Sequence, residues 1–400
     1  MVIAVILVSA IFLLRGINLI HYITSWARQP QKHNLRQFPA SATKSEYVTE
    51  ALKGIAGNQT VRVLSLAQTL HRKWYWVPST VEEFDEKEID EVIPSIGSPI
   101  RLVRGLNRVI LNFYLLCYLL FRVKKEDTVV MYHSCSYATA MIIAHKLRKL
   151  RFVLEVEEIY QDVNDLSKRL QRAEYDVFNR ASAYIFSSTL LNDIINIDRK
   201  HAAISHGTYK VERDRKCKFN DGKIHVVYAG TLNPKKGGAM TAAGLSTLPD
   251  IYRVHILGVG SFDQVEKIKE KAKHSTNAGG ADVTYDGFFS GEDYIRFIQS
   301  CDIGLSTQNP DAAFNATSFP SKILSYMANG LRVVSVRIDA VETSAVADLI
   351  TYYDEQTPEA IAKAITDVDM SEPYDSRARI AELDARFREE LKRLIEANRA

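Results

Sequence analysis

Short apolar runs alternate with helical stretches along almost the whole chain, and this alternation constrains the fold more than any other feature. Apolar runs of strand length that are separated by helices are typical of parallel β-sheets covered by helices on both faces. In the first half of the chain we expect strands at 17–24, 61–67, 128–133, 152–157, 183–187 and 202–205. In the second half we expect them at 225–229, 253–257, 283–285, 302–306, 332–336 and 349–353. The sequence therefore predicts an α/β protein.

Two series of strands within 400 residues predict two domains, because one hydrophobic core rarely serves a chain of this length. Both are expected to be doubly wound and Rossmann-like. We assign 17–208 to the first domain, 209–222 to a charged linker and 223–370 to the second domain. Residues 371–400 are expected to form a helix that packs back toward the first domain through apolar positions at helical spacing: Ile380, Leu383, Phe387, Leu391 and Leu394.

The composition argues against several classes of function. A net charge of +3 without a concentrated basic stripe does not indicate nucleic-acid binding. The four cysteines form no CxxC pair and have no matching histidine spacing, so neither a zinc site nor a disulfide framework is predicted: Cys117, Cys135, Cys217 and Cys301. A reducing, cytoplasmic compartment is the simplest interpretation.

The N-terminal residues 1–16 form a separate hydrophobic segment. Residues 1–14 carry no charge, and Arg15-Gly16 separates them from the first predicted strand. The run is shorter than the about 20 apolar residues of a spanning helix. It also lacks the positive charge and the cleavage site of a signal peptide. We interpret it as an extra segment, and a membrane anchor is the alternative.

A second apolar run covers residues 109–121 and has basic residues on both sides. Thirteen residues are too few to span a bilayer comfortably. Two interpretations stay open, a buried crossover helix and a helix docked on anionic lipid. The aromatic group Trp74-Tyr75-Trp76 could add an interfacial contact. The flanking basic residues are Arg101, Arg104 and Arg108 before the run and Arg122, Lys124 and Lys125 after it.

Glycines follow three successive strands of the second domain, where ligands bind in open α/β sheets. The loop 230–238 begins with Gly230-Thr231 and contains Lys236-Gly237, so its backbone could approach a phosphate while the lysine neutralises its charge. A glycine turn with solvated lysines is the alternative. Gly258 and Gly260 follow the second of these strands, and Gly287 follows the third. Neither GxGxxG nor GxxxxGK[ST] occurs in this loop, which disfavours nicotinamide cofactors and nucleotide hydrolysis.

The segment 315–335 predicts a short helix between Pro320 and Gly330, since proline favours a first turn and glycine favours a helix end. The loop before it is small and polar, which leaves the helix N-terminus open to an anion. A purely structural helix, packed through Ile323, Leu324 and Met327, is the alternative. The pairing of a polar loop with an open N-terminus favours a phosphate site.

Together, the motifs GTLNPKKGG, ILGVG, YDGFF, CDIGLS and FPSKILSYMANGLRVVS resemble the donor domain of family 4 retaining glycosyltransferases with the GT-B fold. The match is strongest to the branch that builds bacterial polysaccharides and lipid-linked glycans, and it covers most of 223–354. The resemblance implies two domains that face each other across a cleft. It implies that Gly230, Lys236 and Gly237 surround the diphosphate of a UDP- or GDP-linked sugar. Further donor contacts are implied at Thr231, Gly258, Gly260, Gly287, Ser318, Phe319, Pro320, Ser321, Lys322 and Ser325.

This sequence departs from the family at three donor positions. Thr231 stands where an arginine is frequent, so Lys236 would carry more of the phosphate charge, helped by Lys235 or Lys322. Two glutamates of the family are replaced by Thr317 and Ser325, and neither can act as a carboxylate. The loss keeps open a catalytically silent homologue that acts as a partner subunit.

The acceptor side offers three candidate catalytic residues. The resemblance implies that His133, at the end of the strand 128–133, faces the transferred sugar. Glu157 and Glu158 close the next strand, and one of them could accept the proton of the acceptor hydroxyl. A histidine that merely ends a strand and a solvated acidic loop are the alternatives.

The expected function is transfer of a hexose, with retention, from a nucleotide sugar to a lipid-linked or polysaccharide acceptor. No metal and no cofactor are expected, because lysine and a helix dipole would take the place of a cation. The protein is expected to be cytoplasmic and peripheral on the inner face of the plasma membrane. A nucleotide-sugar epimerase of the same architecture is the other alternative.

Overall fold

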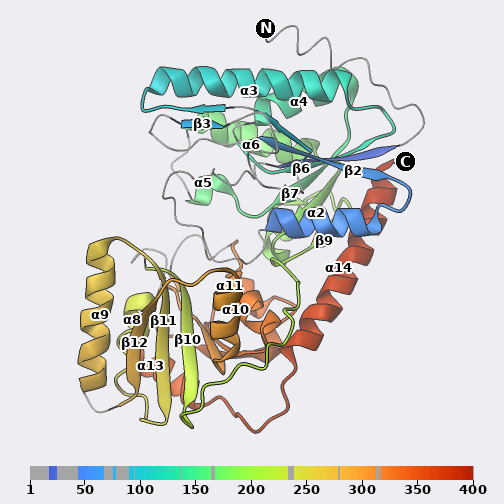
Figure 1. The fold of residues 1–400 in the computed structure, drawn as a ribbon. Coiled ribbons are helices and arrows are strands. Elements are labelled where there is room, and N and C mark those ends of the chain that lie inside the picture. Colours follow the sequence, from blue (N-terminus) through green and yellow to red (C-terminus); the bar gives the residue numbers. More distant parts are fainter. Residues whose placement is uncertain are drawn as a thin grey trace.

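The computed structural model describes residues 18–24, 44–66, 75–77, 90–93, 95–135, 137–163, 167–232, 238–277, 280–311, 315 and 317–399. The hydrophobic segment 1–16 lies outside these residues, as do residues 233–237 of the predicted phosphate loop 230–238. Figure 1 shows two sheets in separate halves of the molecule, with helix α14 in red running along one side of both.

The first domain is built on a parallel sheet of the strand order β4-β2-β1-β6-β7-β8-β9. Its first strand β1 pairs with β2 on one side and with β6 on the other. The strands are β1 (Leu19–Thr24), β2 (Thr60–Leu66), β4 (Glu91–Ile93), β6 (Thr128–Tyr132), β7 (Phe152–Val156), β8 (Ala183–Phe186) and β9 (Ala202–Ile204).

The second domain contains a parallel sheet of the order β12-β11-β10-β13-β14-β15. The chain thus moves outward from β10 in one direction and then back to β13, which places the carboxyl end of β10 at the point where the strand order reverses. The strands are β10 (Ile224–Thr231), β11 (Tyr252–Val259), β12 (Asp282–Gly287), β13 (Ile303–Ser306), β14 (Arg332–Val336) and β15 (Ile350–Tyr353).

The predicted strands are all present in the two sheets, with ends that differ by a few residues. The sequence did not predict β4 or the antiparallel pair β3 (Tyr75–Val77) and β5 (Ser95–Gly97). Each of these strands has three residues, which is too short to show a period of two. They form by pairing with a neighbouring strand.

Helices cover both sheets. In the first domain they are α2 (Lys44–Ile55), α3 (Arg101–Phe121), α4 (Ala138–Arg148), α5 (Tyr160–Val163), α6 (Lys168–Arg180) and α7 (Thr189–Ile195). In the second domain they are α8 (Ala239–Ala242), α9 (Phe262–Asn277), α10 (Gly291–Gln299), α11 (Lys322–Ala328), α12 (Asp339–Glu342) and α13 (Pro358–Thr366). The segment 209–222 contains no helix or strand.

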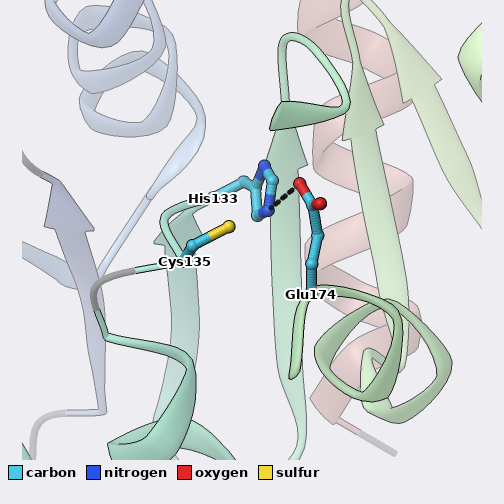
Figure 2. A group of neighbouring side chains, drawn as sticks. All are labelled: His133, Cys135 and Glu174. Carbon is cyan, nitrogen blue, oxygen red and sulfur yellow. Dashed lines mark ion pairs between the residues drawn. The ribbon is translucent and has the colours of Figure 1, made fainter. Parts of the chain in front are cut away.

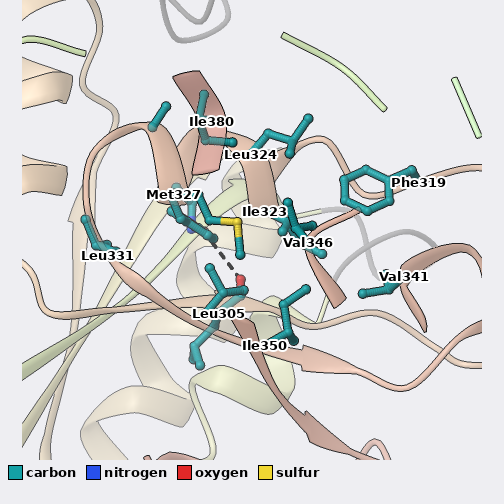
Figure 3. Close-up of a cluster of buried hydrophobic side chains, with 14 of the residues drawn as sticks. Leu305, Phe319, Ile323, Leu324, Met327, Leu331, Val341, Val346, Ile350 and Ile380 are labelled. Carbon is teal, nitrogen blue, oxygen red and sulfur yellow. Dashed lines mark hydrogen bonds between the residues drawn. The ribbon is translucent and has the colours of Figure 1, made fainter. Parts of the chain in front are cut away.

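Helix α11 packs into the hydrophobic core of the second domain. Figure 3 shows Ile323, Leu324 and Met327 of this helix among Leu305, Val346 and other apolar side chains. All three helix residues are at most 1% exposed. The predicted packed face of the helix is therefore confirmed. Gly330 ends the helix with a φ of 89°, the left-handed conformation that glycine adopts most readily.

The C-terminal helix α14 (Ser376–Arg399) joins the two domains, as predicted. Near its start, the Ser376 hydroxyl donates to the Met327 carbonyl at 2.9 Å, in the second domain. Further along, Phe387 stacks on Tyr47 of α2 with ring centroids 5.5 Å apart. The five apolar positions predicted for this contact are all at most 5% exposed. Burial of this stripe on both domains ties them together.

Candidate functional site

The carboxyl edge of the first sheet contacts the segment that precedes α11 in the second domain. The Ser188 hydroxyl, just after β8, donates to the Thr317 carbonyl at 2.9 Å. The ring of His206, just after β9, lies 5.0 Å from that of Phe319. Burial lowers the pKa of His206 to about 4, so this imidazole is neutral near pH 7. These contacts join the carboxyl edge of the first sheet to the segment that contains the donor candidate Phe319.

On the donor side, Lys322 extends from α11 to the carboxyl end of β10. Its Nζ lies 4.2 Å from the centre of the Tyr228 ring. A Cβ atom on Gly230 would lie 3.0 Å from the same Nζ, so the missing side chain leaves room for the ammonium. Among the residues that the structure describes, no carboxylate forms an ion pair with Lys322. Burial lowers the pKa of Lys322 to about 8.

An ammonium without a carboxylate partner is unfavourable in a half-buried position, because desolvation penalises the charged form. The Tyr228 ring compensates only in part, since a cation–π contact contributes about 0.5–2 kcal/mol. An anion at the carboxyl end of β10 would remove the penalty. Lys322, which the sequence suggested only as a helper, is thus the described residue best placed to hold a phosphate.

The other predicted lysine cannot be placed, because Lys236 and Gly237 lie outside the described residues. The two ends of their loop are fixed. Thr231 and Leu232 continue β10, and the Gly238 N–H donates to the Thr307 carbonyl at 3.1 Å. A Cβ atom on Gly238 would lie 2.4 Å from the Thr307 side chain, so glycine is required there. The described ends of the loop thus lie at β10 and at the end of β13.

The helix N-terminus differs from the expectation. Pro320 lies before the helix, and its carbonyl accepts a hydrogen bond from the Ile323 N–H at 3.0 Å. Ser321 is the N-cap, and its side chain makes no capping hydrogen bond. The helix has only seven residues, so its dipole is small. Ser318 is half-buried beside the buried Phe319. Among the described residues, Lys322 therefore offers more positive charge at this point than the helix dipole does.

Several buried hydroxyl groups around the start of α11 and the end of β13 have no hydrogen-bond partner among the described residues. The Oγ1 atom of Thr317, which replaces a family glutamate, has no hydrogen bond among the described residues. The same holds for Ser306 and Thr307 at the end of β13. Their positions after a strand were the available signal, and the sequence interpretation missed them. Ser325, the other replacement, contacts the Tyr294 hydroxyl instead of standing free for a ribose.

The predicted glycines at the strand ends have different physical reasons. Gly258 has a φ of 154°, and a Cβ atom there would lie 1.8 Å from the Gly230 carbonyl oxygen. Its small size is therefore required by the neighbouring strand. Gly260 has Leu232 and Gln264 close to its Cβ position. Gly287 has a φ of 92° and open space around it. Only Gly287 leaves room that a ligand could use.

On the acceptor side, His133 is buried and held by its neighbours. Its Nε2 lies 3.3 Å from Glu174 Oε1, and the two side chains are 3% and 0% exposed. Figure 2 shows Glu174 reaching His133 from α6, with Cys135 beside them. The Tyr160 N–H donates to the same carboxyl oxygen at 2.8 Å, and the Tyr160 ring packs 4.8 Å from the imidazole. Glu174 is thus the charged neighbour of His133, although His133 Nε2 makes no hydrogen bond among the described residues. Strand patterns could not reveal this neighbour.

His133, Cys135 and Glu174 could also hold a metal ion, because their ligand atoms lie within 4.8 Å of one another. Histidine, cysteine and glutamate are all zinc ligands. Burial and the Glu174 charge raise the pKa of the Cys135 thiol to about 12. Without a metal the thiol is therefore protonated and hydrogen-bonds Glu174. The expectation that no metal is needed stays a prediction.

The two candidate carboxylates follow β7 and are both half-buried. The Tyr132 hydroxyl donates to Glu157 Oε2 at 2.7 Å, and the Ser187 hydroxyl donates to the Glu157 carbonyl at 2.6 Å. Burial, together with the Glu157 charge, raises the pKa of Tyr132. Glu157 is therefore ordered near the junction. Glu158 follows it in the chain. Burial raises the pKa of the Tyr160 hydroxyl, and the negative charge of Glu158 raises it further.

Glu155 is a third carboxyl group in this region, inside β7. It is fully buried, and its Oε2 accepts a hydrogen bond from the Tyr22 hydroxyl at 2.6 Å. Burial raises the pKa of Glu155 to about 7, against the opposing effect of the Lys44 charge. A carboxyl group whose pKa is higher in the folded protein than in the unfolded chain makes its full contribution to stability at pH values below the unfolded pKa. That stability is lost as the pH rises to the folded pKa.

We expect Glu155→Gln to remove this pH dependence. Between pH 4.5 and 8 the unfolding free energy of the unsubstituted protein should fall, relative to the variant, by on the order of 3 kcal/mol. Urea denaturation of both proteins at several pH values measures the difference. The exposed Glu396→Gln is the matched control. A difference that is the same at pH 4.5 and pH 8 would contradict the prediction.

Comparisons with known proteins bear on the fold and on the second domain. Residues 223–368 match the family model described as Glycosyl transferases group 1. No curated protein matches the chain by sequence. Among solved structures, the Anabaena protein HepE in complex with UDP aligns with a TM-score of 0.63 at 13% identity over 94% of this chain and 99% of its own.

Two further solved structures align over nearly their whole length. A trehalose-6-phosphate protein from E. coli bound with UDP-2-fluoro glucose has a TM-score of 0.60 at 10% identity, covering 94% of this chain and 97% of its own. A sucrose-phosphate synthase from Thermosynechococcus elongatus has a TM-score of 0.56 at 13% identity, covering 96% of both. The fold is GT-B. This confirms the predicted fold class, and the second domain matches the group 1 glycosyltransferases.

Proposed function

We propose that this GT-B protein is a glycosyltransferase that binds a nucleotide sugar against Lys322 and transfers its hexose to an acceptor held by the first domain. The observation that carries the proposal is the half-buried Lys322 ammonium at Gly230, which has no carboxylate partner among the described residues. It lies within the segment that matches group 1 glycosyltransferases. Two proteins of the same fold hold UDP or UDP-2-fluoro glucose, which supports a nucleotide diphosphate as the anion.

Each candidate residue has a role in this reaction. Lys322, with Lys236 from the adjoining loop, stabilises the charge that develops on the leaving diphosphate. His133, oriented by Glu174, contacts the transferred sugar. Glu157 or Glu158 accepts the proton of the acceptor hydroxyl as the glycosidic bond forms. The Ser188 and His206 contacts keep the two sets of residues together.

The finer parts of the proposal come from the family resemblance. We propose retention of the anomeric configuration, a lipid-linked or polysaccharide acceptor and work on the cytoplasmic face of the membrane. The silent partner subunit and the epimerase are not favoured by any contact of the described residues. The silent homologue keeps its support in the sequence from the loss of the family glutamates at Thr317 and Ser325.

The decisive experiment offers purified protein a panel of UDP- and GDP-sugars with membrane lipid extract. We expect release of the nucleotide and a lipid product that carries the sugar. Nucleotide binding without product would instead identify a silent homologue. Conversion of the nucleotide sugar without any acceptor would identify an epimerase.

The same assay tests whether a metal is needed. We expect EDTA to change the turnover by less than about twofold, because lysine side chains can supply the positive charge that a metal supplies in other transferases. The metal content of the protein, measured by mass spectrometry before and after EDTA, is the control. Turnover that EDTA abolishes and Zn²⁺ restores would instead assign a metal role to His133, Cys135 and Glu174.

A further inference from the structure

Helix α3 exposes a continuous apolar face. Residues 101–121 form one helix of 21 residues, longer than the apolar run 109–121 seen in the sequence. Among the described residues, α3 is the one helix that is long and apolar enough to cross a membrane, and 22% of its most apolar window is buried. Seven large apolar side chains on or beside it are exposed by 49–81%: Ile100, Leu102, Leu106, Val109, Ile110, Phe113 and Phe121.

These side chains form a stripe. With 3.6 residues per turn, four of them project within an arc of roughly 60° along the first three turns: Leu102, Leu106, Val109 and Phe113. Scattered exposed apolar residues are ordinary on a protein surface, but a continuous stripe marks an interaction site. A buried crossover helix, one of the two interpretations of the sequence, would not expose it. That interpretation is therefore wrong for this face.

The opposite face holds α3 on the first domain. Leu111, Leu115 and Leu119 are at most 3% exposed. Asn112 Oδ1 accepts a hydrogen bond from the Ala140 N–H of α4 at 3.2 Å. Arg148 donates to the carbonyls of Leu119, Leu120 and Val123 at the helix end. Crossing a bilayer would break these contacts, so the helix can present its stripe to a membrane only by lying parallel to the surface.

The charges around the apolar stripe indicate what kind of surface α3 binds. Between Ser98 and Lys125 the sequence has six basic residues and no acidic one. Arg101, Arg108 and Lys125 are exposed. Basic residues beside an apolar helical face are typical of helices that lie in the interface of anionic lipid bilayers. A protein partner would require complementary acidic groups, whereas an anionic bilayer supplies both the charge and the apolar layer. Figure 1 shows α3 on the outer end of the first domain, away from the second domain.

We propose that α3 is a membrane-docking helix that inserts Leu102, Leu106, Val109, Ile110 and Phe113 into an anionic lipid surface. Arg101, Arg108 and Lys125 meet the headgroups. The inference stands on exposure and charge in the first domain and does not depend on the transferase reaction. Its failure would leave the donor site unchanged, and failure of the donor site would leave the docking helix unchanged.

The first test measures partition of the full chain between buffer and vesicles of phosphatidylcholine with about 30% phosphatidylglycerol. We expect the triple variant Leu106→Ser, Val109→Ser, Phe113→Ser to lower the partition coefficient by about a hundredfold, because it removes most of the apolar stripe. The matched control is Ile197→Ser, Ile251→Ser, Phe262→Ser, which changes three exposed apolar residues elsewhere and should bind as before. Arg101→Glu with Arg108→Glu should lower binding at least tenfold at low salt.

A second measurement reports on α3 directly, whatever other part of the chain touches lipid. The three native tryptophans contribute to every spectrum, so the spectrum of the unsubstituted protein is subtracted. In these difference spectra the emission of Phe113→Trp should shift to the blue and be quenched by brominated lipid when vesicles are added. Phe262→Trp, 79% exposed on α9, should show neither change. A Phe113→Trp spectrum that matches that of Phe262→Trp, while the protein is bound to vesicles, would overturn the proposal. A second result would also overturn the proposal: the protein forms a stable dimer, the apolar triple variant dissociates that dimer, and the same variant binds vesicles as well as the unsubstituted protein does.

Discussion

Replacing Lys322 by methionine should lower kcat/KM for the nucleotide sugar by roughly a hundredfold, while the protein stays folded. Methionine keeps most of the length and the apolar contact with the Tyr228 ring, and it removes only the charge. The diphosphate of the donor would then enter a half-buried site without its cation. Stability should stay the same or rise, because the free protein no longer carries a desolvated ammonium.

The loss should be tested by calorimetry with UDP and by steady-state kinetics. Lys363→Met is the matched control, since Lys363 is exposed on α13 and pairs with Asp367 at 2.8 Å. Lys322→Arg should recover part of the activity, because it restores the charge with a larger headgroup. Equal UDP affinity in the unsubstituted protein and in Lys322→Met would remove Lys322 from the proposed phosphate site.

The pH dependence of UDP binding adds an independent readout. Burial holds the pKa of Lys322 at about 8 in the free protein. A bound diphosphate favours the charged ammonium, so binding above pH 8 should be accompanied by proton uptake, and affinity should fall as the pH rises past 8. Calorimetry in buffers of different ionisation enthalpy measures that uptake. The uptake should be absent in Lys322→Met.

Replacing His133 by alanine should lower kcat by roughly a hundredfold, and Glu174→Gln should lower it by a smaller factor. His133 ends β6 at the edge that meets the donor segment, and Glu174 holds its Nε2 at 3.3 Å. Glutamine has the shape of Glu174 and can still accept from the Tyr160 N–H, but it offers no charge to the imidazole. We therefore expect Glu174→Gln to change kcat more than KM.

A purely structural role for Glu174 predicts a different result. Urea denaturation of Glu174→Gln would then show a lower unfolding free energy, with kcat unchanged for the folded fraction. Glu155→Gln is the matched control, because it also replaces a fully buried carboxyl group of the first domain. Normal kcat in both His133→Ala and Glu174→Gln would remove this pair from the reaction.

Much of the fold could be predicted because its strands are buried on both faces. A run such as Val333–Val334 must be apolar wherever a central parallel strand is covered by helices, so the pattern survives in the sequence. The positions after those strands could be predicted for the same reason, since ligands of open α/β sheets bind there. The short strands β3, β4 and β5 could not, because three residues carry no measurable period.

The candidate site was predicted less completely. Thr317 and Ser325 were recognised as neutral replacements, but their environments depend on Ser188 of the other domain and on Tyr294 of a neighbouring helix. The partner of His133 lies 41 positions further along the chain, on α6. Such pairings are made by packing and leave no local pattern.

The sequence by itself determined the two parallel sheets and the helix that ties them together, because apolar periodicity is a local property. Its motifs over 223–354 also resemble a glycosyltransferase donor domain, because glycine placement is local as well. Only the tertiary structure decided which lysine meets the end of β10. Lys322 is 92 positions from Gly230 in the chain, yet its ammonium lies where the missing side chain of that glycine leaves room. The same is true of α3, because exposure of its apolar stripe depends on which face the domain core covers.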